Sequence, residues 1–165
     1  GLNDGTANTA HTAFFDHGNN RVPATITYEL NTSVNTLGYD ITEIQSVAGW
    51  SGVNETHGNQ TFELFVSVVG DASFSSLGSF SNEPYVLDTA GGDTSTRITL
   101  TDDSGLIASG VDEIRFVYSQ NTFSGFSGVL LREIDIEGVA TVPEPSSMAL
   151  ATLGGLAIMS RRRRK

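Results

Sequence analysis

The chain has no cysteine, so disulfides, thiol nucleophiles and thiolate zinc sites are excluded. It has only four prolines in 165 residues, and two of them, Pro143 and Pro145, stand close together near the C-terminus. Enzyme signatures such as H-E-x-x-H and G-x-S-x-G are absent, and the spacing of the three histidines (His11, His17 and His57) is unspecific. We therefore expect a protein that is not an enzyme.

Positive charge is scarce outside the last five residues. Residues 1–140 contain 18 acidic side chains and four arginines, whereas residues 161–165 are all basic and the whole chain has a net charge of -10. An acidic body without a stripe of Lys or Arg repels a phosphate backbone, so nucleic-acid binding is not expected. A surface of this kind, rich in Thr, Ser, Asn and Gly, suits an environment outside the cytoplasm.

The chain is long enough for one folded domain. Hydrophobic residues make up 38 %, and the 18 glycines bring the composition near that of ordinary globular proteins. The first residue is Gly1, so we expect that any secretory signal peptide would lie upstream of this sequence.

Hydrophobic periodicity predicts short strands and no amphipathic helix in the body. The predicted strands are residues 24–30, 40–47, 61–69, 96–102, 112–118 and 129–137, with weaker candidates at 74–80 and 85–87. Ile41 and Ile44 have opposite parity, which predicts a β-bulge between them. Residues 61–69 are apolar on both parities, which predicts a central strand covered on both faces.

Segments rich in Gly, Asn, Asp and Ser separate these strands and predict turns. They are residues 16–20, 49–60, 90–95, 102–105 and 120–128. About eight short strands joined in this way predict an all-β fold, an antiparallel jelly-roll sandwich over residues 1–138, followed by a linker at 139–142.

The C-terminal tail, residues 143–165, has three parts: a Pro-Glu-Pro motif, an uncharged stretch at 146–160 and a basic cluster. The uncharged stretch would measure roughly 22 Å as a helix, which is short for a bilayer span. The basic cluster would stay on the cytoplasmic side of a membrane. We therefore expect a short C-terminal transmembrane helix.

The tail resembles the PEP-CTERM sorting signal of bacteria, which is also labelled the C-terminal domain of ice-binding proteins. The resemblance rests on Val142, Pro143, Glu144, Pro145 and Ser146, followed by the apolar stretch and the arginines. It implies that an exosortase, a membrane transpeptidase, recognises the motif. It also implies that the helix anchors the chain only transiently in the inner membrane and is removed during export to the cell surface or extracellular matrix. The alternative is an ordinary single-span anchor, which explains the helix and the arginines but not the motif.

The body resembles the galactose-binding-like jelly roll, the fold of discoidin-type domains and many carbohydrate-binding modules. The landmarks are Asn-Asp-Gly at 3–5, Phe-Val-Ser-Val at 65–68 and Arg-Glu-Ile-Asp-Ile-Glu-Gly at 132–138. The resemblance implies a structural calcium ion, an oxygen-seeking cation, held by Asp4 and Glu133. Further oxygen donors would be Thr6, Asn8 or Thr9. The alternative is that Asp4 caps a turn and Glu133 lies on a solvated face.

The same resemblance implies carbohydrate binding by loops at one end of the sandwich, where an aromatic face meets the sugar and polar groups fix its orientation. The candidate residues are Trp50, Asn54, His57 and Asn59 in one loop, and Asn121, Phe123 and Phe126 in another. The alternative is that Trp50 plugs the core and the two phenylalanines close the end of the sandwich.

These features predict an exported, non-catalytic protein of the cell surface or extracellular matrix that binds polysaccharide. The expected partners are an exosortase, an extracellular polysaccharide and, before processing, the membrane through residues 146–160. The alternative function is that of a structural or adhesive surface protein that assembles with itself and recognises no sugar.

Overall fold

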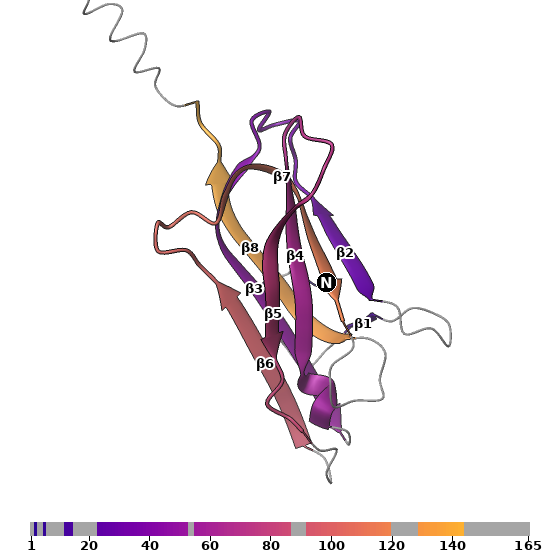
Figure 1. The fold of residues 1–165 in the computed structure, drawn as a ribbon. Helices are drawn as coiled ribbons and strands as arrows, with labels where there is room; N and C mark the ends of the chain where they lie inside the picture. The colour runs from indigo at the N-terminus through magenta and orange to yellow at the C-terminus, as the bar shows by residue number, and fades with distance from the viewer. Residues whose placement is uncertain are drawn as a thin grey trace, which may run out of the picture.

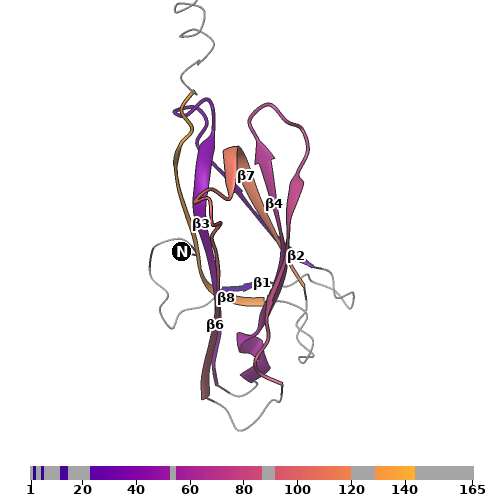
Figure 2. The same cartoon turned by 60° about the vertical axis from the view of Figure 1, so that its left-hand side comes forward.

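The computed structural model describes residues 2, 5, 12–14, 23–52, 55–86, 92–119 and 129–143. These residues form an antiparallel β-sandwich of two layers (Figures 1 and 2). The expected all-β antiparallel sandwich is therefore confirmed.

The described residues contain eight strands and one short 3-10 helix. They are β1 (Thr12–Phe14), β2 (Ala24–Glu29), β3 (Tyr39–Gly52), η1 (Glu55–Gly58), β4 (Gln60–Val68), β5 (Ser75–Asn82), β6 (Gly92–Leu100), β7 (Ala108–Tyr118) and β8 (Val129–Ala140). One layer has the order β1-β8-β3-β6 and the other β2-β7-β4-β5. The layers join where Tyr39 and Ile41 of β3 pair with Val111 and Ala108 of β7.

The core lies between the layers. Because side chains alternate across a strand, each strand contributes every second residue to this interior. Ile44, Leu64, Ile114 and Phe116 are at most 1 % exposed. Phe62 packs its ring against those of Phe80, Phe116 and Tyr118, with centroids 5.1 to 5.7 Å apart.

The prediction that the strand at 61–69 is covered on both faces is wrong. β4 lies between β7 and β5, and its inner residues are buried, but Glu63 on the outer face is exposed and Phe65 is only half-buried. Phe65 lies opposite Arg115 in the ladder, and the Arg115 guanidinium lies 3.6 Å from the centre of the Phe74 ring. The apolar outer-face residue thus belongs to a small surface cluster rather than to a second core.

The predicted bulge in β3 is confirmed, since the pairing of β3 with β8 shifts register between Ile41 and Glu43. Other boundaries differ. β3 runs on to Gly52 and β6 starts at Gly92 because the two strands pair from Ile44–Leu100 to Gly52–Gly92, so parts of the predicted loops 49–60 and 90–95 are strand. The candidate strand at 85–87 is wrong for its described residues, which lie outside any strand. β1 was not predicted, because three residues are too few to show an alternating pattern.

The C-terminal end of the sandwich is β8, which runs through Ala140, so the first two residues of the predicted linker belong to the strand. The predicted transmembrane helix falls on residues beyond Pro143, outside the described part of the chain. Within the described part, no helix has the length and apolar character needed to cross a membrane.

Candidate functional site

Trp50 and His57, two of the predicted sugar-binding residues, lie together at one end of the sandwich. Trp50 stands near the end of β3, opposite Thr94 of β6, rather than on a loop. His57 belongs to η1, and its ring meets that of Trp50 edge to face with centroids 5.6 Å apart. Both side chains are half-buried. The pair offers an aromatic surface beside an imidazole, which are groups that suit a sugar.

Asn59, predicted as a third ligand residue, has a structural position instead. It is 2 % exposed. Its amide nitrogen donates to the carbonyl of Tyr85 at 2.7 Å, and its amide oxygen accepts from the backbone N–H of Tyr85 at 3.1 Å. The nitrogen and the oxygen of the amide therefore both bond the backbone of Tyr85, after β5, and the side chain is not available to a ligand in solvent. Asn54, Asn121, Phe123 and Phe126 lie outside the described residues.

A network of buried polar side chains lies next to η1 and holds it in place. The Gln60 amide nitrogen donates to the carbonyl of Ser46 and to the carbonyl and hydroxyl of Thr96, at 3.0 to 3.1 Å. The Ser46 hydroxyl donates to the Gln60 amide oxygen at 2.6 Å and lies 2.8 Å from the Tyr118 hydroxyl. Burial raises the pKa of the Tyr118 hydroxyl above its ordinary value, so this group stays protonated.

The network reaches η1 directly, because the Thr96 hydroxyl donates to the carbonyl of Gly58 at 2.7 Å. It joins β3, β4, β6 and β7 at the end of the sandwich that carries Trp50. Buried polar groups that are fully bonded make a region rigid. The sequence showed Ser46, Gln60 and Thr96 only as polar residues at strand ends, so their connection could not be predicted.

Glu133, predicted as a calcium ligand, is buried on the outer face of its layer. It is 0 % exposed, and its Oε1 accepts from the backbone N–H of Gly5 at 3.0 Å. The neighbouring N–H of Ile134 donates to the carbonyl of Leu2 at 2.6 Å. The start of the chain thus lies against this part of β8, and the alternative that Glu133 faces solvent is wrong.

The carboxylates of Glu133 and Asp135 act on a nearby tyrosine. Burial and these two negative charges together raise the pKa of Tyr28 to about 12. The other expected calcium ligands, Asp4 and Thr9, lie outside the described residues. Among the residues that are described, no three His, Cys, Asp or Glu side chains gather closely enough to hold a metal.

The start of the C-terminal tail is held by hydrogen bonds at the end of the sandwich opposite to Trp50. Asp40 accepts hydrogen bonds from the hydroxyls of Ser109 at 2.5 Å and Thr141 at 2.6 Å, and from the N–H of Gly110 at 3.3 Å. The two hydroxyls lower the pKa of Asp40, so the carboxylate stays ionised. The Thr141 N–H also donates to the carbonyl of Gly38 at 3.0 Å. Of the sorting motif, Val142 and Pro143 are exposed, and Glu144, Pro145 and Ser146 lie outside the described residues.

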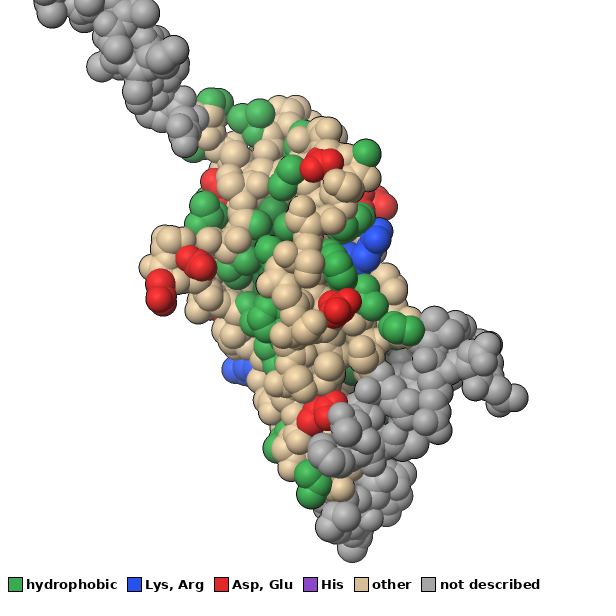
Figure 3. Space-filling model, in the orientation of Figure 1, with side chains coloured by type: hydrophobic (Ala, Val, Ile, Leu, Met, Phe, Trp, Pro, Cys, Tyr) green, Lys and Arg blue, Asp and Glu red, His purple; other side chains and the backbone are tan. Residues whose placement is uncertain are grey.

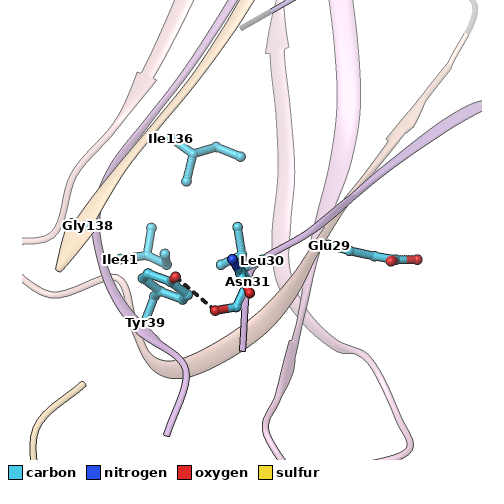
Figure 4. A pocket seen from close by; sticks show the side chains of 7 residues that line it. All are labelled: Glu29, Leu30, Asn31, Tyr39, Ile41, Ile136 and Gly138. Atoms are coloured by element: carbon cyan, nitrogen blue, oxygen red, sulfur yellow. Dashed lines mark hydrogen bonds between the residues drawn. The ribbon is translucent and has the colours of Figure 1, made fainter. Parts of the chain in front are cut away.

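A pocket of about 310 Å³ opens between β2 and β8 at the same end (Figure 4). Leu30, Ile41 and Ile136 form its apolar part. The Tyr39 hydroxyl beside it donates to the carbonyl of Asn31 at 3.1 Å. Sequence reasoning gave no signal for this pocket, because its residues come from three strands and a loop that are distant in sequence.

Comparison with known proteins agrees with these observations in two parts. Residues 141–164 match the PEP-CTERM protein-sorting motif, which confirms the predicted signal. No curated protein matches the chain. An F5/8 type C domain from Bacteroides fragilis has a TM-score of 0.50 and 13 % identity, with 86 % of this chain and 80 % of that chain covered. CpGH89CBM32-6 from Clostridium perfringens has a TM-score of 0.46 and 12 % identity, with 83 % and 82 % covered.

The body therefore has a sandwich fold that resembles the galactose-binding-like jelly rolls. The tail carries a PEP-CTERM sorting signal, which implies export, processing by an exosortase and sorting to the cell surface.

Proposed function

We propose that this protein is a non-catalytic, surface-sorted protein whose sandwich binds polysaccharide at the end that carries Trp50. The observation that carries the proposal is the union of a sorting motif at residues 141–164 with a sandwich of galactose-binding-like fold. The Trp50–His57 ring pair supplies the aromatic surface, and the Gln60 network supplies the rigid support beneath it.

The orientation of the sandwich supports this assignment. β3 begins beside the root of the tail and ends near Trp50, and the eleven residue steps from Tyr39 to Trp50 span roughly 36 Å at the rise of a β-strand. A chain held by its tail would thus present Trp50 away from the surface to which the tail leads. A polysaccharide outside the cell would meet this end first.

Before processing, residues 146–160 anchor the chain in the inner membrane, in our proposal. The stretch has no charged residue, and the five cations that follow it would remain on the cytoplasmic side. An uncharged stretch of 15 residues makes a weak span, which suits an anchor that is later removed.

Replacing Trp50 with alanine should weaken the binding of the full chain to its polysaccharide at least tenfold. The reason is that a ring contributes a large contact area to a sugar face. Glycan arrays would identify the ligand, and calorimetry would give the affinity of both proteins.

The matched control is Tyr39→Ala, which removes an aromatic ring from the pocket at the opposite end. Loss of binding in this variant, with Trp50→Ala unaffected, would move the sugar site to that pocket. Ligand-free oligomers or fibres with no array signal would favour the self-assembling structural protein instead. Turnover in a broad screen for glycosidase and esterase activity would contradict the non-catalytic assignment.

We also propose that the body holds a structural calcium ion through Glu133. A carboxylate that is 0 % exposed suits a cation, because buried charge is costly unless it is compensated. The Gly5 N–H bond to Glu133 brings the residue that follows Asp4 to the same place. Asp4 and Thr9 would complete the oxygen ligands.

Calcium at 100 times its dissociation constant should therefore stabilise the native state by about 2.7 kcal/mol, because it binds only the folded chain. The melting temperature should rise by several degrees relative to the chelator-treated protein. In the Glu133→Gln variant the same addition should have little effect. Equal melting of the unmodified chain in calcium and in chelator would exclude the ion.

A further inference from the structure

The exposed apolar side chains of the described residues gather at the end where the tail leaves. Among the residues whose positions are described, eight large hydrophobic side chains are at least 36 % exposed, and six of them are at this end. These six, which we call the tail-end rim, are Val34, Leu37, Val68, Val69, Val139 and Val142. Green side chains flank the root of the tail in Figure 3. Single exposed apolar residues are ordinary, but a set of this size at one end of a soluble domain marks a contact surface.

Hydrogen bonds tie the segments of the rim to one another. The N–H of Val69 donates to the carbonyl of Gly110 at 2.9 Å, and the N–H of Gly110 reaches the Thr141 hydroxyl at 3.2 Å. The backbone N–H of Thr141 in turn donates to the carbonyl of Gly38, the residue after Leu37. The β2–β3 loop, the β4–β5 turn and the end of β8 are therefore joined through the start of β7, and the rim is a fixed surface.

The length of the tail identifies what this surface meets. Ser146, the first residue of the uncharged stretch, is four residues beyond Val142, and four residues span at most about 14 Å. The headgroup layer on each side of a bilayer is about 5 to 8 Å thick. A chain anchored by residues 146–160 therefore keeps the rim within reach of the lipid surface.

The charges around the rim determine how it would bind. The rim contains only Val and Leu, and the charged described residues within three positions of it in the sequence, Asp40, Asp71 and Glu137, are all acidic. These described charges do not attract anionic lipid, so we expect contact to depend on apolar burial. The covalent link to the anchor supplies a high effective concentration, so a weak contact is sufficient.

We propose that the tail-end rim rests in the headgroup region of the bilayer while the sorting tail is still attached. This inference rests on the membrane anchor in the proposed function. The occupant of the rim is the lipid surface, and removal of the anchor releases the sandwich from it.

The absence of cysteine makes the test direct, since one introduced cysteine gives one labelled position. Leu37→Cys places an environment-sensitive fluorophore in the rim, and Val34→Cys gives a second rim position. Asp93→Cys is the matched control, because Asp93 is exposed at the start of β6, opposite Ser51 near the other end. The labelled full chains are reconstituted with phosphatidylcholine vesicles that contain headgroup nitroxide lipid.

Both rim labels should be quenched several-fold more strongly than the label at residue 93, and their emission should shift to the blue. Flotation of the same samples reports the anchor separately. Chains that float while all three labels behave as in water would overturn the contact and leave the anchor standing. Chains that fail to float would contradict the anchor and, with it, the contact.

Discussion

Replacing Gln60 with alanine should lower the free energy of unfolding by about 3 to 5 kcal/mol. Gln60 is 1 % exposed, and its amide makes four hydrogen bonds to Ser46 and Thr96. The substitution would leave several buried polar groups without partners, each at a cost of about 1 to 3 kcal/mol, and would open a cavity beside them. Because the surrounding structure can relax around the smaller side chain, the total loss should be less than the sum of these individual costs. Urea denaturation of the full chain measures the change.

The control is Gln45→Ala, a glutamine-to-alanine substitution on β3. Among the described residues, the Gln45 amide bonds to the carboxylate of Glu43 at a partly exposed position. This variant should stay within about 0.5 kcal/mol of the unmodified chain. Tyr118→Phe removes one hydroxyl from the network. It should lower the free energy of unfolding by about 1 to 2 kcal/mol, between the effects of the other two substitutions. If Gln60→Ala were no more harmful than Gln45→Ala, the network would not stabilise this end of the sandwich.

Replacing Pro143, Glu144 and Pro145 together with alanine should reduce the amount of chain at the cell surface more than tenfold. Proline fixes φ and disfavours helix at the residue before it, so alanines would let the helix of the proposed anchor extend into the motif that the exosortase recognises. The untrimmed chain, with its arginines intact, should accumulate in the membrane fraction. Cell fractionation and mass spectrometry of the C-terminus measure both effects.

A matched triple substitution is available in an exposed loop. Asp102, Asp103 and Ser104 lie between β6 and β7, and changing all three to alanine should leave sorting unaltered. If the motif variant were trimmed and displayed normally, residues 143–145 would not be the element that is recognised. The tail would then be an ordinary single-span anchor.

Alternating apolar residues predicted most of the strands, because burial on one face imposes a period of two. The end of β3 escaped prediction, since Gly49, Trp50, Ser51 and Gly52 do not alternate and pair with an equally polar stretch of β6. For the same reason Trp50 was placed on a loop. The strand order was also beyond reach, because pairing depends on contacts between residues far apart in the chain.

The candidate site was only partly predictable. Asn59 has the composition of a sugar ligand, but whether its amide faces solvent or Tyr85 depends on a contact 26 residues away. Glu133 shares its parity with Asp135 and Glu137, which favoured a solvated position, whereas in the structure it is buried and accepts a hydrogen bond from Gly5, 128 residues distant. Composition and spacing identify which groups are present, whereas long-range packing determines which of them are accessible.

The pairing of β8 with β3 has a mechanical consequence. The tail leaves from the end of β8, while Trp50 stands near the far end of β3, and the two antiparallel strands pair from Tyr39–Ala140 to Ala48–Leu131. A pull between an attached tail and a glycan bound at Trp50 would load these hydrogen bonds in shear, all at once, rather than peel them apart one by one. If the sandwich binds polysaccharide as proposed, its strands are thus arranged to resist tension along the line that joins the tail to the bound polymer.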